Sequence, residues 1–181
     1  MPGANHRGAD LTHADFSGQD ESGSIFLGAN CSGAKFHGTR LVGATFYGAN
    51  CRSADFTNAD LSGANLEGAD CTNATFTKAN LSGARLYGAD FSPVTAPNAN
   101  FAGANCLGAD FHESDLQRAS FAGANLRGAD LHQVNLLEGS LANATCRGTD
   151  LRNATLRNVN ARGANLNGAN LSGADRTGMH S

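Results

Sequence analysis

A strict five-residue period runs through the chain and limits what it can fold into. If residues numbered 5n+1 are taken as centres, those from Leu11 to Leu171 are Leu, Phe or Cys, except Glu21, Ala96 and Ala161. Ala stands two residues before the centre in 26 of 35 units, and 22 of the 23 Gly stand two residues after it. This period matches neither an α-helix nor the two-residue alternation of a long strand. It predicts short extended segments joined by corners.

The place of a residue in the unit predicts where its side chain points. Alternate residues of an extended segment share one side, so Ala and the centre point inward and the Asp or Asn between them points outward. The Gly position marks the corner, because Gly and Asn best tolerate the positive φ that a type II turn requires. Six corners carry Asn instead of Gly: Asn58, Asn73, Asn98, Asn143, Asn153 and Asn158.

The number of sides in one coil follows from the centres alone. Centres twenty residues apart are identical in 15 of 29 pairs, whereas those five apart are identical in 7 of 32. Residues twenty apart are therefore expected to stack, and four five-residue sides close a square coil. The prediction is one all-β domain over residues 1–181, a quadrilateral parallel β-helix of about nine coils (181 residues at twenty per coil).

The pattern resembles the A(D/N)LXX motif of the pentapeptide repeat proteins, as in Ala59-Asp60-Leu61 and Ala169-Asn170-Leu171. The resemblance covers essentially the whole chain and implies a right-handed quadrilateral β-helix, a hand that agrees with parallel β connections generally. Some family members bind DNA gyrase and topoisomerase IV by resembling B-form DNA, and so give quinolone resistance. Those relatives are more acidic, often carry projecting loops and dimerise through a C-terminal extension, none of which is evident in this sequence.

Two segments depart from the motif before the C-terminal end. Glu21 and its neighbours break the pattern, so residues 1–25 are expected to form an irregular first coil. Residues 92–98 keep the five-residue count but replace a large centre with Ala96. That change predicts either a kink or thin spot in the core, or a bend dividing the rod into two halves.

The C-terminal end also breaks the pattern. Arg176 replaces an apolar centre, and residues 176–181 are expected to be a short tail, too short for a capping helix. A bare end face is then a candidate for end-to-end association into a homodimer. Its expected contact residues are Leu156, Leu166 and Leu171.

Charge and composition exclude several classes of protein. The net charge of -3 and pI of about 6.0 fit neither a basic nucleic-acid binder nor a strongly acidic protein, so direct nucleic-acid binding is not expected. No apolar run is long enough to span a membrane, and the N-terminus lacks the apolar core of a signal peptide. A cytoplasmic location is expected, and it fits five cysteines outside any small disulfide-dense frame.

The five cysteines all occupy inward centres, which predicts reduced, buried, small apolar side chains rather than reactive thiols. They are Cys31, Cys51, Cys71, Cys106 and Cys146. A filled rod without long loops also lacks a pocket with convergent groups, so no enzyme, cofactor or metal is expected.

Three outward sets are candidate binding surfaces, each with a purely structural alternative. The acidic column holds Asp70, Asp90, Asp110, Asp130 and Asp150. The apolar column holds Leu27, Tyr47, Tyr87 and Leu107. The basic collar holds Arg147, Arg152, Arg157 and Arg162, one on each side of a coil.

The alternatives to binding differ among the three sets. Asp or Asn in this position serves local backbone hydrogen bonding, and nearby His and Arg offset the acidic column. The apolar column equally fits scattered surface residues, and the basic collar fits a solvated belt that keeps the end of the rod soluble.

The leading hypothesis is a non-enzymatic structural or protein-interaction scaffold that presents flat faces to an unknown protein partner. The alternative is a DNA-mimicking modulator of a type II topoisomerase, of the quinolone-resistance type.

Overall fold

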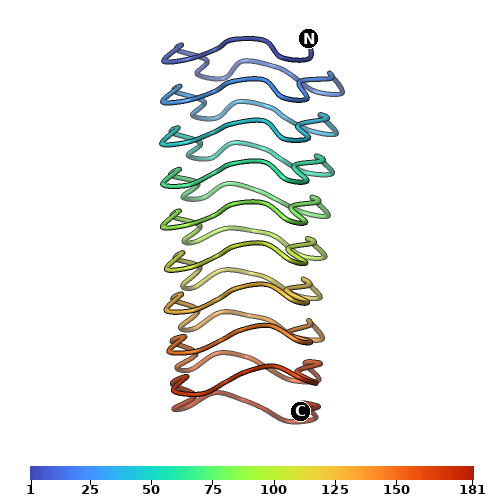
Figure 1. Cartoon of the computed structure of the whole chain (residues 1–181), viewed down its shortest axis with the longest axis vertical. Coiled ribbons are helices and arrows are strands. Elements are labelled where there is room, and N and C mark those ends of the chain that lie inside the picture. Colours follow the sequence, from blue (N-terminus) through green and yellow to red (C-terminus); the bar gives the residue numbers. More distant parts are fainter.

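The chain winds into one straight rod of stacked coils, with its two termini at opposite ends (Figure 1). The computed structural model describes all residues, 1–181. It contains no helix and no strand of more than one residue; its regular elements are isolated parallel β-bridges. Every bridge joins residues twenty apart, from Asn5 with Ile25 to Asn160 with His180. Twenty residues therefore close each coil. The structure also has no helix that is long and apolar enough to cross a membrane.

Single bridges replace the expected strands because each five-residue side is mostly turn. One side of the first coil shows the repeating bonds: the N–H of Leu11 donates to the carbonyl of Asn30 at 2.7 Å, and that of His13 to Ser32 at 2.9 Å. The N–H of Asn30 returns a bond to the carbonyl of Ala9 at 2.9 Å. The outward residue before each centre is therefore the one that forms parallel bridges, both to the coil before it and to the coil after it.

The corners adopt the backbone conformation that the sequence predicts. In nearly every unit the N–H of the Ala position donates to the carbonyl of the preceding centre, as from Ala14 to Leu11 at 2.9 Å. The corner residue has positive φ at 22 Gly and at 13 other residues, including all six predicted Asn. The exception is Pro93, whose ring holds φ near about −65°; the Ser92–Pro93 peptide is cis.

The interior is filled by inward side chains that form a single cluster of 52 buried residues. In one column Phe16, Phe36, Phe56 and Phe76 stack with ring centroids 4.8 to 5.1 Å apart. Phe26 and Phe46, which form the column on the opposite side of the coil, meet them edge to face across the core at 5.5 to 5.7 Å. Both geometries are favourable for aromatic rings, so they stabilise the stacking of the coils that carry these phenylalanines.

The segment around Ala96 is neither a bend nor a thin spot. Figure 1 shows a rod that stays straight through residues 92–98. The ring of Phe91 lies 4.9 Å from that of Phe76, and both Phe91 and Ala96 are fully buried. A large residue in the column that holds Cys31, Cys51 and Cys71 therefore compensates for the small one next to it.

The expected irregularity of residues 1–25 is not seen, because they follow the same turns and bridges as the rest. Glu21 keeps its inward place and is only 2% exposed. Its carboxylate pairs with the N-terminal ammonium of Met1 and accepts a 2.6 Å hydrogen bond from the Ser24 hydroxyl. Burial alone would raise the pKa of Glu21, but these two partners hold it below its usual value. The ring of His6 stacks on Phe26 at 4.8 Å and covers the site.

Residues 176–181 are not a free tail, because they continue the last coil. The N–H of Ala161 donates to the carbonyl of His180 at 2.6 Å, and that of Leu156 donates to Asp175 at 2.8 Å. Leu156 is consequently fully buried, and its expected place on a bare end face is wrong.

Candidate functional site

The acidic column is a continuous stack on one side of the rod. Parallel bridges join Asp70 to Asp90, Asp90 to Asp110, Asp110 to Asp130, and Asp130 to Asp150. Each carboxylate accepts a hydrogen bond of 2.9 to 3.1 Å from the backbone N–H two residues later. The local role predicted for this position is therefore present in all five members.

Cationic groups and imidazoles face most of the column. Asp70 lies 2.6 Å from Nε of Arg52, and Asp150 lies 2.6 Å from a terminal nitrogen of Arg152. Burial acts to raise the pKa of Asp70, but hydrogen bonds from Thr72 and Arg52 keep it below the usual range. The hydrogen bond from Arg152 lowers the pKa of Asp150 in the same way. Only Asp90 of the five has no such partner, so the column is not a bare acidic stripe.

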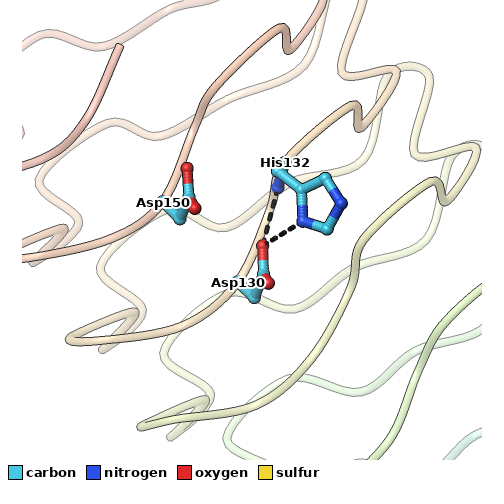
Figure 2. A group of neighbouring side chains, drawn as sticks. All are labelled: Asp130, His132 and Asp150. Atoms are coloured by element: carbon cyan, nitrogen blue, oxygen red, sulfur yellow. Dashed lines mark hydrogen bonds and ion pairs between the residues drawn. The ribbon is translucent and has the colours of Figure 1, made fainter. Parts of the chain in front are cut away.

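Two successive coils repeat an Asp-x-His pair in this column. The Nδ1 of His112 lies 2.8 Å from Asp110, and that of His132 lies 2.7 Å from Asp130. The two imidazoles stack in parallel, with centroids 4.9 Å apart. The hydrogen bond to Asp110 raises the pKa of His112. Figure 2 shows the backbone nitrogen and Nδ1 of His132 both reaching one oxygen of Asp130, beside Asp150.

Ser92 approaches His112 but does not complete a nucleophilic triad. A triad places the serine on one imidazole nitrogen and the carboxylate on the other. Here the Ser92 hydroxyl lies 2.7 Å from Nδ1 and 3.2 Å from Nε2 of His112, while Asp110 also approaches Nδ1. Both oxygens thus compete for the same nitrogen, and Ser92 is only 6% exposed.

The apolar column is two separate tyrosines rather than a continuous patch. Tyr47 and Tyr87 are 51% and 54% exposed, whereas Leu27 and Leu107 are half-buried. Between the tyrosines, Glu67 forms an ion pair with Arg85 at 2.9 Å. Ile25, which is 37% exposed on the same side, was missed by the sequence analysis although it occupies a position that usually holds Asp or Asn.

The four arginines of the basic collar are exposed on successive sides of one coil. Arg152 is paired with Asp150, and Arg157 lies 3.9 Å from Asp175. Arg147 and Arg162 have no ion pair. The collar therefore has two free cationic groups, on two different sides of the rod.

The C-terminal end carries an open hollow of about 460 Å³. It is lined by Leu166, Leu171, Arg176, Met179 and Ser181. Two of the three predicted contact residues are therefore on this face, and Met179 was missed because the turn that carries it was taken as tail.

All five cysteines are free and fully buried. Burial raises the pKa of Cys146 to about 11, so this thiol is protonated at neutral pH. The first three lie twenty residues apart and stack in one column of the interior.

Comparisons with known proteins agree with this geometry. The sequence model for pentapeptide repeats matches in eight copies, over residues 24–63, 54–92, 98–136 and 140–175. No curated protein matches the chain.

Solved structures give the same result. HetL, a pentapeptide repeat protein of the cyanobacterium Nostoc sp. strain PCC 7120 involved in regulating heterocyst differentiation, is 28% identical, with a TM-score of 0.54 over 99% of this chain and 88% of its own. A trypsin-treated variant of QnrB1, a plasmid-mediated fluoroquinolone resistance protein, is 23% identical, with a TM-score of 0.67 over 99% of this chain and 91% of its own. The second likeness shows the fold alone. With its five-residue period, twenty-residue coil and matching sequence model, the chain belongs to the pentapeptide repeat family.

Proposed function

We propose that the chain is a non-enzymatic scaffold, a right-handed rod of about nine coils (181 residues at twenty per coil) that presents a flat face to a protein partner. The single observation that carries the proposal is the exposure of Tyr47 and Tyr87, both more than half accessible on one side of the rod. Tyrosine is enriched in protein interfaces because it buries a large ring and still offers a hydroxyl.

The neighbourhood of the tyrosines suits a contact surface. Both are followed by Gly corners, Gly48 and Gly88, around which a Cβ atom would meet nothing within 4 Å. The tyrosines lie two coils apart, about 10 Å at the usual strand spacing. The Glu67–Arg85 ion pair supplies a polar element between the two exposed rings. The involvement of HetL in regulating heterocyst differentiation is consistent with a function that depends on protein contacts rather than on catalysis.

Affinity capture with matched variants tests the scaffold proposal. The wild-type rod is expected to retain a specific protein that the double variant Tyr47→Ser/Tyr87→Ser loses. The control is Thr57→Ser/Thr77→Ser, at the equivalent positions on the opposite side of the rod. Retention of the same partner by the tyrosine variant would refute the proposal.

A second candidate is a DNA-mimicking modulator of a type II topoisomerase. The observation that favours it is the stack of five carboxylates, with Asp90 free of any cationic partner. A gyrase supercoiling assay with and without a fluoroquinolone tests it. Inhibition or drug protection that disappears in Asp90→Asn/Asp110→Asn/Asp130→Asn, with folding intact, would support this function over the scaffold.

We also propose end-to-end association through the C-terminal hollow. Apolar Leu166, Leu171 and Met179 surround the hollow, and they are only partly buried in the single chain. Light scattering is expected to give the mass of a dimer for the wild type and of a monomer for Leu171→Lys.

A cytoplasmic location is proposed from the five free cysteines.

A further inference from the structure

We propose that Asp130, His132 and Asp150 form a binding site for a divalent transition-metal ion of the Zn²⁺ or Co²⁺ type. One ligand atom from each side chain lies within 4.8 Å of the other two. Two carboxylates and one imidazole form a donor set typical of Zn²⁺ and Co²⁺ rather than of Ca²⁺, which takes oxygen ligands only. The sequence contains the Asp-x-His repeat at residues 110–112 and 130–132, but the repeat alone does not indicate a metal site.

The local electrostatics of the stack favour a bound cation. At other outward positions an amide stacks on the carboxylate and donates to it: Asn80 donates to Asp60 at 3.0 Å, and Asn135 to Asp115 at 3.3 Å. Asp130 and Asp150 are bridged neighbours without such a donor between them. Like charges directly opposite on adjacent strands are destabilising. An ion held by both carboxylates removes that repulsion.

Small side-chain movements complete the site. Ligands of a tetrahedral ion with bonds of about 2.1 Å lie about 3.4 Å apart, so no pair of donor atoms must approach by more than roughly 1.4 Å. The side chains of Asp130, His132 and Asp150 are 39%, 27% and 25% exposed, and rotations about their own bonds are not blocked by a closed core. The other donors to the ion are water molecules on the open side.

The second Asp-x-His pair positions the imidazole. His112 stacks on His132 with an angle of 4° between the ring planes. His112 is itself fixed by Asp110 and by the hydroxyl of Ser92. The stack limits the rotation of His132 and keeps its ring edge toward the two carboxylates, so we assign His112 as a positioning residue and not as a ligand.

Arg152 is the built-in competitor for the ion. Its Nε donates to both oxygens of Asp150, at 2.9 and 2.8 Å. The Arg152 side chain is 52% exposed, and exposed ion pairs are weak, so the guanidinium can swing into solvent when the ion binds. Removal of Arg152 is therefore expected to tighten metal binding, an effect that a damaged fold cannot imitate.

The test is titration of tag-free protein with Zn²⁺ by calorimetry and with Co²⁺ by visible absorption. One ion per chain is expected. His132→Ala and Asp150→Asn should each weaken binding at least about tenfold, and Arg152→Ala should strengthen it several-fold. His37→Ala, an exposed histidine on another side of the rod, is the matched control and should leave affinity unchanged.

Two results would overturn the site. One is the lack of saturable binding of either ion up to about 1 mM. The other is binding that His132→Ala and His37→Ala weaken equally, which would indicate unspecific binding to surface histidines. Thermal unfolding of each variant without metal verifies that the rod is intact.

Discussion

Phe91 and Ala96 are expected to depend on one another, because together they fill the volume that Cys71 and Phe76 fill one coil earlier. The ring of Phe91 lies 4.9 Å from that of Phe76, and both side chains are fully buried. Phe91→Cys removes most of that ring and leaves a cavity. Ala96→Phe forces a second ring into space that Phe91 already occupies.

The magnitudes follow from core substitutions in other proteins. Loss of a buried Phe costs about 3 kcal/mol, at the low end because Cys keeps part of the volume. Overpacking by Ala96→Phe costs about 2 kcal/mol. If the two changes were independent, their sum would be about 5 kcal/mol. The double variant restores the Cys-and-Phe arrangement of residues 71 and 76, so we expect about 2 kcal/mol, a coupling of about 3 kcal/mol.

Urea unfolding followed by far-ultraviolet circular dichroism measures the three variants against the wild type. The slope of the free energy with urea must stay constant, since stacked repeats can lose two-state behaviour. A double variant as unstable as the sum of the single variants would refute compensation. It would mean that the pocket of Phe91 is not the space missing at Ala96.

Three further predictions concern the corners, a buried hydroxyl and an imidazole. Gly123→Ala should destabilise the rod by about 1 kcal/mol in urea unfolding, because the φ of +67° strains a residue with a Cβ. The space around Gly123 is open, so a steric clash adds nothing to this cost. An unchanged free energy of unfolding would refute a positive φ at this corner. Ser114→Ala should lower the free energy of unfolding by about 1 to 3 kcal/mol. The Ser114 hydroxyl accepts a hydrogen bond from the N–H of Val94 at 2.9 Å and donates one to the carbonyl of Phe91 at 2.8 Å. A neutral effect would contradict those bonds. The pKa of His112 is raised above its unfolded value by Asp110, so its contribution to stability is full below about pH 6.5 and is lost as pH rises through the folded pKa. The unfolding midpoint of the wild type should fall over that pH interval relative to His112→Gln, and parallel pH profiles would contradict the pairing.

The fold was largely predictable because one repeated pattern encodes it. Inward and outward positions, positive-φ corners and twenty-residue stacking all follow from the five-residue period. Confirmation extends to single positions, such as the bridge from Asp130 to Asp150 and the positive φ of Asn73. The pattern could not show that each side has one bridging residue instead of a strand, because that depends on how much of the side the turn takes.

Departures from the motif were harder to interpret, because their effect depends on neighbours one coil away. Glu21 is accommodated by Met1 and Ser24, and Ala96 by Phe91, so neither breaks the coil. Leu156 is covered because Arg176 and the residues after it continue the winding. In each case the deciding contact joins residues that the period brings together but whose side chains it does not orient.

The candidate surfaces were located by sequence, but their chemistry was not. Stacking placed the acidic column correctly on one side, yet only the structure shows which carboxylates have a cationic group or an imidazole beside them and that Asp90 has neither. Exposure of Tyr47 and Tyr87 and half-burial of Leu27 and Leu107 likewise depend on rotamers and on the adjacent corners.

Site-specific photo-crosslinking tests the scaffold function most directly. A photoreactive phenylalanine analogue is placed at position 47 or 87, and at position 82 on another side of the rod as a control. The proposal predicts that positions 47 and 87 crosslink to the same protein and that position 82 does not. Crosslinks of equal yield from position 82, or none from 47 and 87 while the rod still associates with its partner, would contradict the aromatic face as the binding surface.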